Sequence, residues 1–244
     1  MPSVRPHVPA VVSRDFFIVT CEHGGNRIPA RYRNYFSGHG GFLETHRGYD
    51  RGALPMARSL ASALSAPLFY TTVSRLLIDL NRSPNHPKLY SELTRPLPRQ
   101  VKQEIMERHY LPYRTEVESR VAQAVKQGRR VIHISSHSFT PELNGEVRDA
   151  DIGLLYDSKR SEESKLCRLW QAALKKSLPD LRVRMNYPYS GSSDGLTAAL
   201  RKRFTPDTYT GVELELNQLH AYTDDRHWRA LCTGIIKALS QALA

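Results

Sequence analysis

Residues 16–29 read FFIVTCEHGGNRIP. The apolar run Phe16–Thr20 predicts a short β-strand, and a glutamate and a histidine follow it as Glu22 and His23. Two glycines come next, and glycine lets the backbone turn sharply and approach another group closely because it has no Cβ atom. The stretch therefore predicts a strand that ends at a polar site, with a close backbone approach beside it.

The rest of the chain alternates between strand-like and helix-like patterns. The predicted strands are Phe16–Thr20, Leu68–Val73, Leu76–Leu80, Val131–Ser135, Ile152–Tyr156, Leu181–Met185 and 211–218. The predicted helices are Ala53–Leu64, Arg99–Gln127 with a break or kink at Pro112, Glu162–Ser177, Leu196–Arg203 and Asp224–Leu243. This alternation predicts an α/β fold of three layers, α/β/α, with a mixed, largely parallel sheet. Between the elements, Asn81–Pro98 is expected to be a long loop, and loops of this length are often functional.

The composition is that of an ordinary globular protein, with 40% hydrophobic and 24% charged residues. Its 244 residues fit one α/β domain over residues 1–244. No run of about 18 apolar residues occurs, so no membrane span is expected. The N-terminal segment MPSVRPHVPAVVSRD lacks the apolar core and cleavage site of a secretory signal. We therefore expect a cytoplasmic protein, and the sequence leaves its oligomeric state open.

The chain is strongly basic, with a formal net charge of +11. Such a protein attracts anions, whether nucleic acid, a membrane surface or a carboxylate substrate. Lys and Arg are spread along the chain, however, and no RNA-recognition aromatic motif, zinc finger or basic zipper is present. We therefore expect most of this charge to be solvated surface charge, with no nucleic-acid partner.

Missing motifs exclude several reaction types. The chain has no G-x-S-x-G for a serine nucleophile, no G-x-G-x-x-G or Walker A sequence for a nucleotide, and no HExxH zinc motif. Its cysteines, Cys21, Cys167 and Cys232, are too widely spaced for a disulfide framework or a Cys-x-x-Cys zinc site. We expect them to be reduced and packed as small apolar side chains.

Polar residues gather after four of the predicted strands, and ligands of open α/β sheets bind outside the carboxyl ends of strands. These residues are Glu22 and His23; Asn81 and Arg82; Ser136, His137 and Ser138; and Glu213, Glu215 and Asn217. Two histidines with several carboxylates match a hydrolytic zinc site, which needs imidazole and carboxylate ligands, a water, and a further carboxylate to accept its proton. The alternative is that the two histidines only form hydrogen bonds at strand ends.

Seven motifs, in this order, resemble the N-formylglutamate amidohydrolase family: TCEHGGNRIP (20–29), THRGYDRGA (45–53), TVSRLLIDLNRS (72–83), HISSHSFTPELNG (133–145), DIGLLYD (151–157), RMNYPYSGSSDGLTAALRKRF (184–204) and YTGVELELNQ (209–218). The resemblance implies a fold similar to that of zinc-dependent exopeptidases. It also implies hydrolysis of N-formyl-L-glutamate to formate and glutamate, a late step of histidine breakdown, with Zn²⁺ or another divalent metal as cofactor.

The resemblance also implies roles for individual residues. His23, Asp50 and His137 would hold the metal, and Glu22 could replace Asp50. A glutamate on the last strand would be the catalytic base. Glu215 is the first choice, but Glu213 could replace it, since residues two apart share a strand face.

A small dianionic N-acyl amino acid is the expected substrate, and arginine suits its carboxylates because the guanidinium group binds a carboxylate through two hydrogen bonds. The residues predicted to contact the substrate are Arg82, first, and Arg75, Asn81, Arg148 and Asn217. Alternatively, these arginines are ordinary surface or ion-paired residues, and Arg75 with Asp79 serves only structure. Two other functions are open: hydrolysis of another N-acyl amino acid or small peptide, and non-catalytic binding of an anion or nucleic acid.

Overall fold

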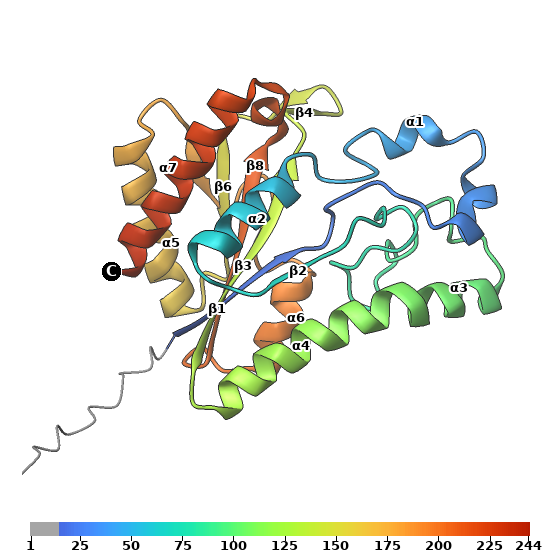
Figure 1. Ribbon diagram of the computed structural model, residues 1–244, viewed down its shortest axis with the longest axis horizontal. Helices are drawn as coiled ribbons and strands as arrows, with labels where there is room; N and C mark the ends of the chain where they lie inside the picture. The colour runs from blue at the N-terminus through green and yellow to red at the C-terminus, as the bar shows by residue number, and fades with distance from the viewer. Residues whose placement is uncertain (1–14) are drawn as a thin grey trace, which may run out of the picture.

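A six-stranded sheet in the order β2-β1-β3-β8-β6-β7 forms the centre of the protein (Figure 1). The computed structural model describes residues 15–244, so most of the N-terminal segment in which no secretory signal is expected lies outside the described residues. The strands of the sheet are β1 (Asp15–Cys21), β2 (Leu68–Tyr70), β3 (Arg130–Phe139), β6 (Ile152–Leu155), β7 (Val183–Met185) and β8 (Tyr209–Asn217).

Four neighbouring strands, β2, β1, β3 and β8, are parallel, whereas β6 is antiparallel to β8 and parallel to β7. Helices α2 (Ala53–Ala63), α5 (Ser161–Ser177) and α7 (Asp225–Leu243) pack on one face of the sheet, and α4 (Leu111–Lys126) and α6 (Leu196–Arg203) on the other (Figure 1). The predicted layers and the mixed, largely parallel sheet are confirmed. The short elements are η1 (Ala30–Phe36), α1 (Gly40–Leu43), the hairpin β4 (Glu142–Leu143) with β5 (Glu146–Val147), and η3 (Gln218–Tyr222).

Side-chain alternation along the strands decides which face of the sheet carries polar groups. Along β8, Val212, Leu214 and Leu216 belong to the apolar cluster with α2, α5 and α7. The intervening Glu213 and Glu215 point to the opposite face, where they are 9% and 5% exposed. Parallel neighbours alternate in the same way, so the polar groups of β1, β3 and β8 meet at one end of the sheet.

One predicted strand, Leu76–Leu80, is wrong. These residues are buried, as the apolar pattern predicted, but they form turns. The N–H of Leu77 donates to the carbonyl of Ser74 at 2.9 Å, and the N–H of Asp79 donates to Leu89 at 2.9 Å. A short apolar run cannot be told from a strand by periodicity alone, and here tertiary contacts with the following loop decide its form.

The predicted helical region Arg99–Gln127 contains an irregular turn next to Pro112, where a break or kink was expected. Helix α3 (Arg99–Ile105) continues through a π-helical turn, η2 (Met106–Tyr110), into α4. Pro112 lies in the first turn of α4. Because proline has no N–H to donate, the chain passes through a single wider turn before it and then resumes an α-helix.

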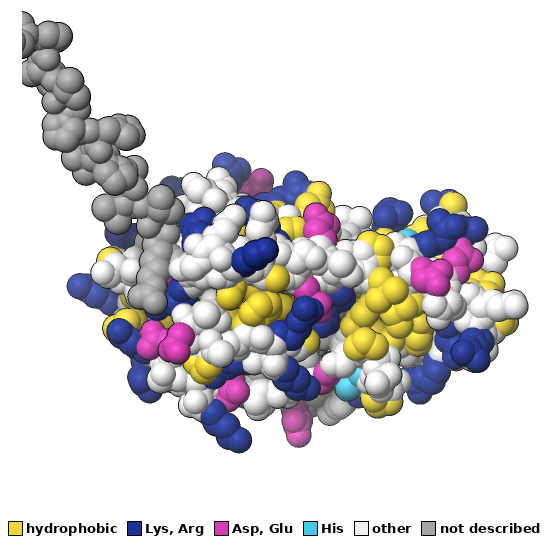
Figure 2. All heavy atoms as spheres, turned by 90° about the horizontal axis from the view of Figure 1, so that it is seen from below, with side chains coloured by type: hydrophobic (Ala, Val, Ile, Leu, Met, Phe, Trp, Pro, Cys, Tyr) yellow, Lys and Arg dark blue, Asp and Glu magenta, His cyan; other side chains and the backbone are white. Residues whose placement is uncertain are grey.

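Basic side chains are interspersed with acidic and uncharged ones on the face that Figure 2 shows. This arrangement agrees with solvated surface charge, and the absence of a nucleic-acid partner stays a prediction. Within residues 15–244, no helix combines the length and apolarity needed to cross a membrane. All three cysteines are free and buried, as expected.

The two glycines after β1 lie where two backbone segments approach each other closely. A Cβ atom on Gly24 would lie 2.8 Å from the carbonyl oxygen of Thr71, and one on Gly25 would lie 2.7 Å from that of Thr72. The N–H of Arg27 donates to the Thr72 carbonyl at 2.9 Å, which holds the segments together. The glycines therefore let the chain turn beside the sheet directly after His23.

We expect Gly25→Ala to lower the free energy of unfolding by about 1–3 kcal/mol, because the added methyl group overlaps backbone that cannot shift freely. The matched control is Gly41→Ala, since a Cβ atom there meets nothing within 4 Å. Urea denaturation of both variants measures the difference. Equal stability of the two variants would show that the close approach is not a constraint on the fold.

Candidate active site

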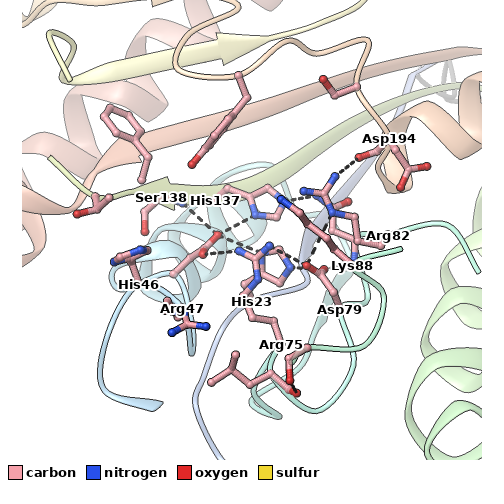
Figure 3. Close-up of a pocket in the computed structure, with 18 of the residues that line it drawn as sticks. His23, His46, Arg47, Arg75, Asp79, Arg82, Lys88, His137, Ser138 and Asp194 are labelled. Atoms are coloured by element: carbon pink, nitrogen blue, oxygen red, sulfur yellow. Dashed lines mark hydrogen bonds and ion pairs between the residues drawn. The ribbon is translucent and has the colours of Figure 1, made fainter. Parts of the chain in front are cut away.

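Three buried side chains, His23, Asp50 and His137, form a group that could hold a metal ion. One ligand atom from each lies within 4.8 Å of the others. The Oδ2 atom of Asp50 lies 3.2 Å from Nδ1 of His23 and 2.9 Å from Nδ1 of His137. The centroids of the two imidazole rings lie 5.0 Å apart, and Figure 3 shows the two rings beside each other.

Each member of this group is positioned by the end of a regular element. His23 follows β1, and its carbonyl accepts a hydrogen bond of 2.9 Å from the N–H of Asp50. Asp50 lies ahead of α2 and also accepts from the N–H of Ser138 at 3.4 Å. His137 lies within β3, which extends beyond the predicted end at Ser135 to Phe139. Ends of β1, β3 and α2 thus converge on one point.

A second carboxylate holds the far nitrogen of each histidine. Nε2 of His23 lies 2.7 Å from Oδ1 of Asp79, and Nε2 of His137 lies 3.1 Å from Oε2 of Glu22. A carboxylate at Nε2 keeps the proton on that nitrogen and leaves the lone pair of Nδ1 for a metal. Both Nδ1 atoms face Asp50. The donor set of two imidazoles and one carboxylate, with carboxylates behind the imidazoles, fits a divalent cation such as Zn²⁺.

Glu22 is fully buried, and its oxygens already have three partners. The hydroxyl groups of Tyr113 and Ser135 each donate to it at 2.8 Å, and His137 is the third partner. Burial would raise the pKa of Glu22, but the hydrogen bond and charge of His137 outweigh it and hold the pKa well below its usual range. These contacts favour Asp50 over Glu22 as the carboxylate ligand.

Asp79 is the main site residue to which the sequence assigned no functional role. It lies 2.7 Å from Nη2 of Arg75, which also reaches Oδ1 of Asp50 at 3.4 Å through Nη1. Burial would raise the pKa of Asp79, but Arg75 and His23 hold it well below its usual value. The aspartate of the quoted stretch TVSRLLIDLNRS was the available signal. Its partner His23 is 56 residues away, and no local pattern reveals that contact.

The two candidate bases have different surroundings. In the register of β3 and β8, Glu215 lies beside His137, whereas Glu213 lies two pairs earlier, beside Ser135, and accepts a hydrogen bond from the Thr197 hydroxyl. The Oε2 atom of Glu215 is buried without a hydrogen-bond partner among the described residues. Burial raises the pKa of Glu215 to about 8; the charge of His137 opposes this shift and that of Asp50 adds to it. Glu215 therefore has a free acceptor beside the group.

A cavity of about 550 Å³ opens over these residues, and both glutamates line it. Its walls carry five basic side chains, Arg47, Arg75, Arg82, Lys88 and Arg95. Four of these come from residues 75–95, and the predicted loop Asn81–Pro98 supplies three of the four. Six carboxylates, those of Asp50, Asp79, Glu92, Asp194, Glu213 and Glu215, also line the cavity, so an anion would be bound by individual basic side chains and not by a net positive charge of the pocket.

Of the predicted substrate residues, Arg75, Asn81 and Arg82 line the cavity. Nη1 of Arg82 donates to the carbonyl of Asp194 at 2.9 Å, and the Oδ1 atom of Asn81 accepts from the N–H of Leu196 at 2.7 Å. The second contact fixes the orientation of the Asn81 amide. The NH₂ group of Asn81 lies 3.5 Å from Nε2 of His137, which also lines the cavity.

Arg148 and Asn217 do not line the cavity. The side chain of Asn217 donates to the carbonyl of Ala150 at 2.8 Å and accepts from the N–H of Leu219 at 3.0 Å. The Asn217 side chain thus caps the short helix η3, and its role in substrate binding stays a prediction. Arg148 instead packs against two aromatic side chains of the cavity wall.

A buried His–Asp–His group with a free carboxylate beside it, at the carboxyl ends of parallel strands, is an arrangement typical of metal-dependent hydrolases. The family model described as N-formylglutamate amidohydrolase matches residues 16–221. The chain belongs to this family of amidohydrolases, as its motifs indicated.

Solved structures show the same fold. A gene product from Agrobacterium tumefaciens is 28% identical, with a TM-score of 0.80 over 93% of this chain and 90% of the other. An N-formylglutamate amidohydrolase from Ralstonia eutropha JMP134 is 16% identical, with a TM-score of 0.66 over 92% of both chains. Among curated proteins, none matches the sequence significantly.

We expect Asp79→Asn and Glu22→Gln each to weaken metal affinity by about 10- to 100-fold, because each removes the carboxylate behind a histidine. Competition with a chromogenic chelator measures the affinity. Asp151→Asn is the matched control: this carboxylate also contacts a histidine Nε2, that of His220, at 2.9 Å, but it does not line the cavity. Unchanged affinity in both site variants would contradict the metal assignment.

Proposed function

We propose that the protein hydrolyses N-formyl-L-glutamate to formate and L-glutamate with a divalent metal, Zn²⁺ being the first candidate. The observation that carries the proposal is the free Oε2 atom of Glu215, which is buried beside the His23, Asp50 and His137 group at a cavity with basic walls. Membership of the amidohydrolase family supports the reaction type. We expect the reaction to serve histidine breakdown in the cytoplasm.

The metal would be held by Nδ1 of His23, Nδ1 of His137 and the carboxylate of Asp50. When bound, Zn²⁺ supplies a Lewis acid for the formyl oxygen and lowers the pKa of a bound water to about 7. Arg75, in contact with both Asp50 and Asp79, keeps the ligand carboxylate and the carboxylate behind His23 in place. Glu22 does the same for His137.

Glu215 would act as the general base and then as the general acid. Its Oε2 atom accepts a proton from water while the water oxygen forms a bond to the formyl carbon. The C–N bond then breaks, and Glu215 returns the proton to the amine nitrogen of glutamate. Burial raises the pKa of Glu215 to about 8, and a cation held nearby would lower it, so the carboxylate could accept and return a proton near neutral pH.

The basic walls would bind the two carboxylates of the substrate. Arg82 follows Asn81, whose amide lies beside His137, so Arg82 is well placed for the α-carboxylate, the carboxylate nearer to the scissile amide. A second candidate function is hydrolysis of a larger N-acyl amino acid or a small peptide, because a cavity of about 550 Å³ has room for one.

Formate release from a panel of N-formyl amino acids tests the function. We expect kcat/KM to be highest for N-formyl-L-glutamate and activity to disappear with a chelator and return with Zn²⁺. Activity confined to larger N-acyl compounds would move the assignment to the second candidate. Full activity after metal removal, checked by elemental analysis, would leave the histidines a structural role only.

Glu215→Gln should keep the metal and lower kcat by about 10²- to 10⁴-fold, since it removes the base but preserves side-chain shape. Elemental analysis and steady-state kinetics on the same preparation measure both effects. Glu213→Gln is the matched control, with a smaller loss expected because Glu213 is engaged with Thr197. A larger loss in Glu213→Gln than in Glu215→Gln would exchange their roles.

A further inference from the structure

Arg148 is a partly buried arginine whose charged group has no partner. Its guanidinium carbon lies 5.0 Å from the ring centroid of Tyr189 and 5.9 Å from that of Phe139. Nη1 is buried without a hydrogen-bond partner, and no described carboxylate forms an ion pair with this side chain. The backbone is fixed, because the N–H of Arg148 donates to the carbonyl of Pro141 at 2.8 Å.

Other arginines near the sheet are engaged. Arg201 pairs with Glu163 at 2.9 Å, and Arg75 pairs with two aspartates. Arg114 has one unpartnered nitrogen, but its Nη1 donates to the carbonyl of Leu80 at 3.2 Å. A buried N–H donor without an acceptor, such as Nη1 of Arg148, costs free energy. The isolation of Arg148 therefore indicates a place for an anionic ligand.

The position of Arg148 connects it to the cavity. Both rings that it contacts line the cavity, and Phe139 lies two residues after His137 on β3. The pKa of His46, another residue of the cavity wall, is lowered by burial and next by the charge of Arg148. The positive potential of Arg148 thus reaches into the cavity. Tyr189 is 46% exposed and its ring contacts the guanidinium group, so a ligand that reaches Arg148 from the cavity would have to displace this ring.

We propose that Arg148 binds the side-chain carboxylate of the substrate and thereby restricts the enzyme to acidic N-acyl amino acids. This inference rests on the proposed function. The α-carboxylate, close to the scissile amide, is assigned to Arg82, and the carboxylate at the far end of a glutamyl side chain needs a second cation. Arg148 is chosen over the cavity residues Lys88 and Arg95 because one of its N–H groups is buried without an acceptor. Phe139 holds the guanidinium group in place while its N–H groups bind that carboxylate.

The test compares N-formyl-L-glutamate with N-formyl-L-glutamine, which has the same shape but no side-chain charge. Arg148→Gln should lower kcat/KM for N-formylglutamate by about 10- to 100-fold, mostly through KM, because a charge-assisted hydrogen bond is lost. Activity on N-formylglutamine should change less than about threefold. Arg148→Lys, which keeps the charge, should recover part of the preference. An equal loss on both substrates, or no loss on either, overturns the proposal.

Two control variants test whether a change in substrate preference has a cause other than the loss of Arg148. Arg184→Gln removes an exposed arginine stacked 4.2 Å from the ring centroid of Tyr187, outside the cavity, and should leave the preference for N-formylglutamate unchanged. Arg82→Lys should lower activity on both substrates, since they share the α-carboxylate. A thermal melt of each variant checks folding. A shift of preference in Arg184→Gln as large as in Arg148→Gln overturns the specific role of Arg148.

Calorimetric titration with glutarate and butyrate separates this inference from the proposed function. Wild type should bind glutarate, which has two carboxylates, more tightly than butyrate, and Arg148→Gln should remove that difference. If this result appears although no N-formyl amino acid is hydrolysed, the carboxylate site stands and the proposed reaction fails. If N-formylglutamate is hydrolysed but the difference is absent or unaffected by Arg148→Gln, the reaction stands and the role of Arg148 fails.

Discussion

The burial of charge at the carboxyl end of the parallel strands constrains the rest of the structure. Glu22, Asp50 and Asp79 have lowered pKa values and face two groups whose pKa values are raised, Arg75 and His137. The three carboxylates are thereby held ionised beside the imidazoles, a donor set that could hold a divalent cation. The elements around the group must keep these carboxylates buried and paired.

The parallel register provides the asymmetry that a hydrolytic site needs. His137 and Glu215 are direct neighbours on β3 and β8, and Glu213 is next to Ser135 two pairs earlier. A shift of two residues along β8 therefore separates a glutamate engaged with a hydroxyl group from one whose Oε2 atom has no partner. The same face carries both, so alternation alone could not choose between them. The choice follows from the neighbour that each meets across the strands.

The sequence predicts what depends on local pattern. Alternation placed Glu213 and Glu215 on one face, and the apolar run before His23 located a strand end with its site. Long-range contacts were out of reach, because the partner of His23 is 56 residues away. The predicted strand Leu76–Leu80 failed for the same reason: burial was read correctly, but contacts with the following loop hold it in turns. Asn217 lies on the same face of β8 as the two glutamates, but its side-chain amide caps the following helix, η3.

Part of the positive charge of the chain lies in and around the cavity. Three arginines there, Arg75, Arg82 and Arg148, differ in how far acidic groups already neutralise their charge. Arg75 is bound to two aspartates and belongs to the support of the metal group. Arg82 gives one nitrogen to a backbone carbonyl and has only a 4.0 Å contact with Asp79, so much of its charge is available. Arg148 has no anionic partner among the described residues. The three arginines thus form a series: Arg75 is fully ion-paired, Arg82 is weakly paired, and Arg148 has no ion pair among the described residues.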